Sequence, residues 1–232
     1  MEKFRHEFKY LISYEQMRLI ADRLKRVMKL DPHAKDGRYL ISSLYYDDPY
    51  DSCFYEVAAG VDLRKKYRLR YYDHDASAVF LECKAKRNNM MLKKNSYLEY
   101  YDALKLVNGG YLRDIADQDD LNKELTYKIM ARGFKPKVIV EYERVPYIYE
   151  AGNIRITFDM NITSSTDLKN FLGQYAYKRS VLPCGSLIME VKYDEFLPSL
   201  IYDCIDIGGL EQLSISKYTL CRKYMIQAED LL

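Results

Sequence analysis

Tryptophan is absent from this sequence of 232 residues, and histidine is scarce, with only His6, His33 and His74. The histidines are scattered along the chain, and none of the five cysteines forms a C-x-x-C pair, so no zinc-type spacing exists. The odd number of cysteines favours reduced thiols over a disulfide framework. These absences argue against a zinc protein and against a secreted disulfide scaffold.

Long apolar runs are missing as well. No run approaches the roughly 18 residues that suggest a membrane-spanning helix, and the first residues, MEKFRHEFKY, lack the apolar core of a signal peptide. We therefore expect a cytoplasmic protein. If it acts at the inner face of a membrane, we expect a membrane-protein partner to recruit it.

A strong charge of one sign is also lacking, because the formal net charge is only +2. Non-specific nucleic-acid binders carry a broad basic field, so we expect no nucleic-acid partner, and any basic site must be local. The phosphate-binding motif G-x-x-x-x-G-K-[ST] and the hydrolase motif G-x-S-x-G are both absent. The chemistry must come from another arrangement of side chains.

Hydrophobic periodicity predicts an α+β protein. Helical spacing marks residues 97–107, 120–132 and 196–207, and a helix over 14–29 follows a capping box at Ser13 and Gln16. The tail, 214–227, is predicted to begin extended and to end as a helix. Alternating patterns predict about eight strands, with a turn at Asn88 and Asn89, at residues 3–11, 38–48, 63–73, 80–86, 91–96, 137–144, 154–160 and 186–193.

Eight antiparallel strands are about the number that closes a small barrel with an interior. We therefore predict one domain over 1–232, a closed antiparallel β-barrel with surrounding helices and a helical insert at about 97–133. Polar residues lining that interior would make it a tunnel.

Charged pairs of the form Glu-x-Lys recur on three distant strands. Alternating charge on one strand is usually a solvated face, but the repetition, and the use of Arg where Lys would serve, favour a shared binding site. Arg binds phosphate oxygens through a planar fork, and hard metals such as Mg²⁺ and Mn²⁺ take oxygen ligands. The recurring pattern therefore predicts a site for a polyanion with a divalent metal. Its Glu-x-Lys pairs in the sequence are Glu7 with Lys9, Glu82 with Lys84, and Glu190 with Lys192.

A series of short motifs resembles the VTC domain, the polyphosphate-polymerase domain of the vacuolar transporter chaperone complex, within the triphosphate tunnel metalloenzyme superfamily. Each motif is weak alone, but their order is specific, and they extend from Arg5 to about Tyr218. The first strand has Arg5 where the wider superfamily has a glutamate, which weakens the case for a second metal ligand there. The motifs are R-x-E-x-K-Y, S-L-Y-Y-D, K-Y-R-L-R-Y-Y, L-E-C-K, V-E-Y-E-R, I-R-I-T-F-D, M-E-V-K-Y and S-I-S-K-Y.

The resemblance implies roles for individual residues. The implied metal ligand is Glu190. Lys93 or Lys94 is an implied phosphate binder, and the motif does not choose between them. The implied catalytic cations are Arg68, Arg70, Lys84, Arg144 and Arg155, and the implied substrate contacts are Lys9, Tyr142, Lys192, Ser216 and Lys217, besides Lys93 and Lys94.

The resemblance also implies a function. A polyphosphate polymerase transfers the terminal phosphoryl group of ATP to a growing polyphosphate chain with the help of Mn²⁺ or Mg²⁺. Two alternatives stay open at this stage: a metal-dependent triphosphatase, in which water is the acceptor, and a non-catalytic module that binds polyphosphate or nucleotide.

Overall fold

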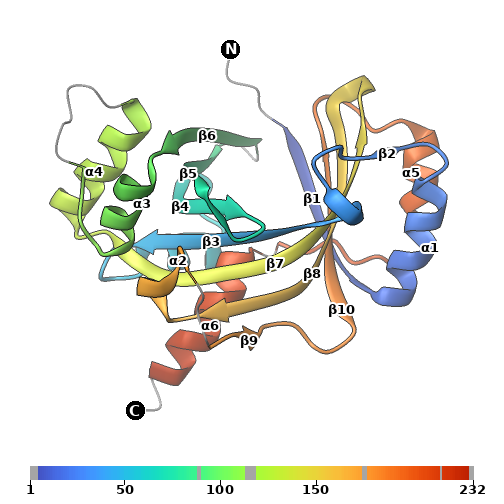
Figure 1. The fold of residues 1–232 in the computed structure, drawn as a ribbon. Coiled ribbons are helices and arrows are strands. Elements are labelled where there is room, and N and C mark those ends of the chain that lie inside the picture. Colours follow the sequence, from blue (N-terminus) through green and yellow to red (C-terminus); the bar gives the residue numbers. More distant parts are fainter. Residues whose placement is uncertain (1–4, 88–89, 113–118, 174–176, 215, 230–232) are drawn as a thin grey trace. The chain divides into compact units, whose positions relative to one another are not determined.

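The computed structural model describes residues 5–87, 90–112, 119–173, 177–214 and 216–229 (Figure 1). The chain divides into two compact units, which are described in turn. Unit 1 comprises Met1–Leu40, Tyr142–Ile162 and Leu182–Ile215, and unit 2 comprises Ile41–Glu141, Thr163–Val181 and Ser216–Leu232. That 1–232 form a single domain stays a prediction.

Strands and helices are both abundant, so the α+β class is confirmed. Hydrogen bonds connect the strands in the order β1-β10-β8-β7-β3-β4-β5-β6. This order has two ends, β1 and β6, so the closed barrel that we predicted is not confirmed: the order among the described residues is that of an open sheet. The bounds are β1 His6–Ser13, β3 Tyr39–Asp47, β4 Arg64–Tyr72, β5 Asp75–Arg87, β6 Met90–Leu98, β7 Lys135–Tyr149, β8 Ile154–Ser165 and β10 Ser186–Tyr193, with the short β2 Lys29–Leu30 on β7 and β9 Arg179–Ser180 on β8.

In unit 1, the helices α1 (Tyr14–Leu24) and α5 (Ser199–Ile205) pack against the apolar face of the strands. The predicted capping box is present, since Ser13 Oγ accepts from the Gln16 amide and the Gln16 side chain accepts from the Ser13 amide. Helix α1 ends at Leu24 rather than at residue 29, because the chain turns there and β2 then pairs with β7. The core includes Ile20, Leu24, Ile156, Phe158 and Met189.

Unit 2 contains the antiparallel strand pairs β3–β4, β4–β5 and β5–β6. The return strand predicted at 91–96 is confirmed as β6, whereas the turn predicted at Asn88 and Asn89 lies outside the described residues. Two of its helices, α3 (Tyr100–Val107) and α4 (Asp120–Arg132), lie in the predicted insert, and two more are α2 (Ser52–Ala58) and α6 (Lys217–Glu229). Helix α4 ends at Arg132 and is capped by Gly133, whose φ of +65° favours glycine.

Within the described ranges, no helix combines the length and the apolar character that a membrane crossing requires.

Candidate anion-binding site

Strands β4, β5 and β6 present one strongly basic face in unit 2. Residues directly opposite each other on antiparallel strands share a face, so the pairing register gives its composition. Four successive rows cross the three strands and contain seven cations but a single carboxylate. The rows are Arg64–Lys86–Met91, Lys66–Lys84–Lys93, Arg68–Glu82–Asn95 and Arg70–Phe80–Tyr97. We call these twelve residues the basic face.

The opposite face of the same strands is mainly apolar, although it also includes Lys65 and Lys94. Leu69 and Leu81 are fully buried there, and the Tyr67 ring meets the edge of Phe134 at 5.9 Å between centroids. The two-residue period of a strand thus separates a hydrophobic face from the basic face, as the alternating sequence predicted.

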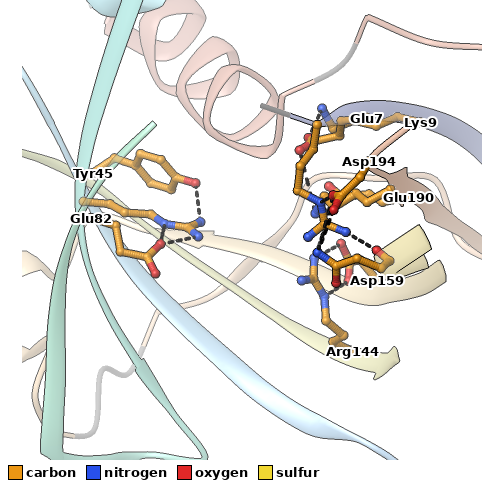
Figure 2. A network of polar contacts seen from close by, with 12 residues as sticks. Glu7, Lys9, Tyr45, Glu82, Arg144, Asp159, Glu190 and Asp194 are labelled. Atoms are coloured by element: carbon orange, nitrogen blue, oxygen red, sulfur yellow. Dashed lines mark hydrogen bonds and ion pairs between the residues drawn. The ribbon is translucent and has the colours of Figure 1, made fainter. Parts of the chain in front are cut away.

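Glu82, the single carboxylate, is buried at the centre of three cations. Its Oε2 accepts from Arg68 Nε at 3.0 Å and Nη2 at 2.8 Å, while its Oε1 lies 2.5 Å from both Arg70 Nη2 and Lys93 Nζ. Arg68 also donates to the Tyr45 hydroxyl at 2.8 Å (Figure 2). The carboxylate therefore holds three cationic groups close together that would otherwise repel one another.

The same arrangement shifts two pKa values. Burial alone would raise the pKa of Glu82, but Arg68, Arg70 and Lys93 outweigh it and hold that pKa far below its usual range. Burial and the neighbouring Arg70 lower the pKa of Lys93 to about 8, although Glu82 opposes the shift. Lys93 is also the most exposed of the three cations, with 41% of its side chain accessible. Lys93 is therefore the cation that can most readily leave Glu82 and bind an anion from solution.

The pairing register separates Lys93 from Lys94. Lys93 lies opposite Lys84 on the basic face, whereas Lys94 lies opposite Cys83 and so belongs to the other face. Lys93 is therefore the stronger candidate for the phosphate contact, a choice that the motif had left open.

Binding of tripolyphosphate is expected to weaken as the pH rises through about 8, the pKa of Lys93. The protonated ammonium attracts the anion, and the neutral amine that replaces it does not. The affinity should therefore be fully present below this pH and should fall above it. Calorimetric titrations on both sides of pH 8 measure the effect.

Lys93→Arg is the control for this titration, because the guanidinium stays charged throughout. Tripolyphosphate itself releases a proton in the alkaline range, and both proteins experience that change equally. A pH dependence that is the same in the variant and in the parent protein would show that Lys93 is not the titrating group.

Unit 1 has a different charged face, on β1, β10 and β8 (Figure 2). Arg144, which is buried, donates to Asp159 through Nε at 2.6 Å and Nη2 at 2.7 Å, and to Glu190 through Nη2 at 3.3 Å. Burial alone would lower the pKa of Arg144, but Asp159 and other neighbours hold it well above its ordinary value. Arg144 is thus a permanent cation held in a planar two-bond pair.

The neighbouring Glu-x-Lys pairs extend this network. Lys192 lies 2.7 Å from Glu190 and 3.8 Å from Glu7, measured from Nζ to the carboxylate oxygen, and Lys9 lies 2.7 Å from Glu7. The register places Lys9 beside Glu190 and Glu7 beside Lys192, so each acid meets a cation of the next strand. The face of unit 1 is close to neutral, whereas the basic face of unit 2 is not.

Arg155 lies on the same face of β8 but has other partners. Its Nη2 lies 2.6 Å from Asp31 Oδ2 and 2.6 Å from the Tyr39 hydroxyl. Asp31 in turn accepts from the backbone and the ring of His33. Its role as a catalytic cation therefore stays a prediction, and any anion would have to compete with Asp31.

Other residues implied by the resemblance contact side chains of neighbouring elements. Lys66 donates to Ser216 Oγ at 3.0 Å, and Lys217, the next residue, is buried at the start of α6. The Arg144 guanidinium lies 5.3 Å from the ring centroid of the buried Tyr142. Lys84 stands on the basic face beside Lys66. Their assignment as substrate contacts stays a prediction.

The divalent metal that the resemblance implies needs oxygen ligands. No group of three His, Cys, Asp or Glu within the described ranges is arranged to hold a metal ion. Glu7, Asp159 and Glu190 do share one face of unit 1, so the donor chemistry fits a hard cation. Each of these carboxylates is paired with a cation, and those pairs would have to separate for a metal to bind.

Sequence reasoning missed three carboxylates as site residues: Glu82, Asp159 and Asp31. The alternation had placed Glu82 on a charged face, but it could not show that Glu82 pairs with Arg68 or that Asp159 pairs with Arg144. Asp31 gave no signal, because its partner Arg155 is 124 residues away.

A family model described as the VTC domain matches residues 4–226. The chain belongs to the VTC domain family. The resemblance drawn from the motifs is thereby confirmed. No match was found among curated proteins.

Several solved structures share the fold of this VTC domain at low sequence identity. HpAC1 from Hippeastrum, described as a candidate adenylyl cyclase with a dominant triphosphatase activity, has a TM-score of 0.55 at 13% identity, covering 97% of this chain and 96% of its own. A candidate adenylate cyclase from Bacillus halodurans has a TM-score of 0.52 at 10% identity, and the match covers 100% of this chain and 92% of the cyclase chain. Another candidate adenylate cyclase, from Vibrio parahaemolyticus, has a TM-score of 0.52 at 11% identity, and the match covers 95% of this chain and 98% of the cyclase chain.

Proposed function

We propose that this VTC domain binds a triphosphate on the basic face of β4, β5 and β6. The observation that carries the proposal is the charge of that face, with seven cations for one carboxylate. A bound polyanion stabilises such an arrangement, because like charges that face one another repel less when an opposite charge lies among them. Arg68 and Arg70 supply planar donors for phosphate oxygens, and Lys66, Lys84 and Lys93 supply point charges.

The proposed reaction is transfer of the terminal phosphoryl group of ATP to inorganic polyphosphate. Phosphoryl transfer is catalysed mainly by positioning and charge neutralisation, so no side-chain nucleophile is required. We propose Glu190 as a ligand of Mn²⁺ or Mg²⁺, the role that the resemblance implies for it; a hard divalent metal would supply Lewis-acid charge neutralisation to the reaction. The cytoplasmic location and a membrane-protein partner remain part of the proposal.

A triphosphatase is the second candidate function. HpAC1, which shares the fold, is described as having a dominant triphosphatase activity. The two reactions would use the same cations and differ in the acceptor, which is water in one and a phosphate chain in the other. The product therefore distinguishes them.

The purified domain, supplied with γ-labelled ATP, Mn²⁺ and a short polyphosphate primer, is expected to produce labelled chains that a polyphosphate gel retains. A polymerase must hold the acceptor chain in line with the terminal phosphate of ATP, and cations on several strands can do this. A reaction containing a chelator in place of Mn²⁺ is the control.

Label found only in free orthophosphate would assign the triphosphatase reaction instead. Absence of metal-dependent turnover, together with retained tripolyphosphate binding, would assign a binding module. Absence of binding would contradict the proposed site itself.

A further inference from the structure

The basic face ends in aromatic side chains. Its last row is Arg70–Phe80–Tyr97, and the Arg70 guanidinium lies 4.8 Å from the centroid of the Tyr72 ring. The Phe80 and Tyr97 rings meet edge to face, with centroids 5.9 Å apart. The character of the face thus changes from cationic to aromatic within one row.

The Tyr97 ring is held in place although it is exposed. Its hydroxyl donates to the Ser77 carbonyl at 3.1 Å, and Phe80 packs against the ring. About half of the residue, 49%, remains accessible. An aromatic ring that is already oriented loses little conformational entropy when a flat ligand stacks on it.

Exposed tyrosines also occur elsewhere, and Tyr101 on α3 is 81% exposed. Exposure alone therefore indicates nothing. Tyr97 differs in its position, because it lies at the end of the basic face, next to rows in which cations outnumber carboxylates. A ligand that joins a polyphosphate group to a flat aromatic group matches both parts of this face.

We propose that Phe80 and Tyr97 form a stacking site for the base of a nucleoside triphosphate whose phosphates lie along the cationic rows. This inference rests on the proposed triphosphate site. It gives the nucleotide a direction, with the base at the Arg70 row and the terminal phosphate toward the row of Lys66, Lys84 and Lys93. Stacking accepts any base, because every base has a π-face, so selectivity among the four nucleotides should be small.

The test compares ATP with inorganic tripolyphosphate, which has no base, by calorimetry in the presence of a chelator. Tyr97→Ala is expected to weaken ATP binding by about tenfold or more, the usual range for loss of one stacked base. Binding of tripolyphosphate should remain as in the parent protein. Tyr97→Phe keeps the ring and should bind ATP nearly as the parent does.

Tyr101→Ala removes an exposed tyrosine outside the basic face and should change neither ligand's affinity. Unchanged ATP binding by Tyr97→Ala would overturn the stacking site. An equal loss of affinity for ATP and for tripolyphosphate would overturn it too. Neither result would contradict the proposed function. Failure of the parent protein to bind tripolyphosphate would instead overturn the proposed function, and the stacking site with it.

Discussion

Glu190→Gln is expected to abolish metal-dependent turnover of ATP while the domain stays folded. The amide keeps the size and polarity of the side chain but lacks the charge that a hard cation prefers. The fold should tolerate the change, because Arg144 keeps its two bonds to Asp159 and Lys192 still has Glu7 within 3.8 Å. Metal-free binding of tripolyphosphate should be intact or slightly tighter. Release of labelled phosphate measures turnover.

Glu143→Gln is the matched control, because Glu143 is a carboxylate of unit 1 that pairs with Arg38 at 2.8 Å. It stands next to Arg144 on β7 and so points to the opposite side of the strand. This variant should retain turnover. Full activity of Glu190→Gln would refute the metal role and leave Glu190 as a partner of Lys192 and Arg144.

The sequence predicted which face of a strand a side chain occupies better than it predicted which side chains are in contact. The alternation of charge marked Glu82 and Lys84 as a charged pattern on one strand, and the pairing register places both on the basic face with Arg68 and Arg70. Which acid meets which cation depends on register and rotamer, which alternation does not encode. Glu82 and Lys84 recur as a sequence pattern on one face, yet the cations that contact Glu82 are Arg68, Arg70 and Lys93.

Lys93 and Lys94 illustrate the same limit. A shift of one residue in register exchanges the two faces of a strand, so a motif that fixes the strand but not its register cannot choose between adjacent lysines. The hydrogen-bonded pairing of Lys93 with Lys84 supplies the missing information.

Long-range pairing explains the two main errors about the fold. The apolar spacing continued beyond Leu24, but the chain leaves the helix there and Lys29–Leu30 pair with β7, more than 100 residues away. Closure of a barrel likewise requires pairing between the end strands of the sheet. Nothing in the alternation of β1 or β6 specifies such a partner, so eight strands suggested a closed barrel where the order is open.

Asp159→Ala is expected to lower the free energy of unfolding by about 3–5 kcal/mol, the usual cost of leaving a buried charge without its partner. Asp159 is fully buried and accepts both bonds of the Arg144 fork, at 2.6 and 2.7 Å. Without it, Arg144 keeps, among the described residues, the 3.3 Å contact to the Glu190 carboxylate and its position over the Tyr142 ring. Urea denaturation measures the loss, and hydrogen exchange of the β8 and β10 amides assigns it to unit 1.

Asp22→Ala is the control for this loss, because Asp22 is 71% exposed and its pair with Lys25 is of a kind usually worth about 0–1 kcal/mol. The double variant Asp159→Leu, Arg144→Met removes both charges and should recover most of the lost stability, since apolar side chains of similar volume can replace a buried ion pair. It remains informative even if Asp159→Ala does not fold. A double variant as unstable as Asp159→Ala would show that the cost comes from lost packing, and that the uncompensated charge of Arg144 is not its cause.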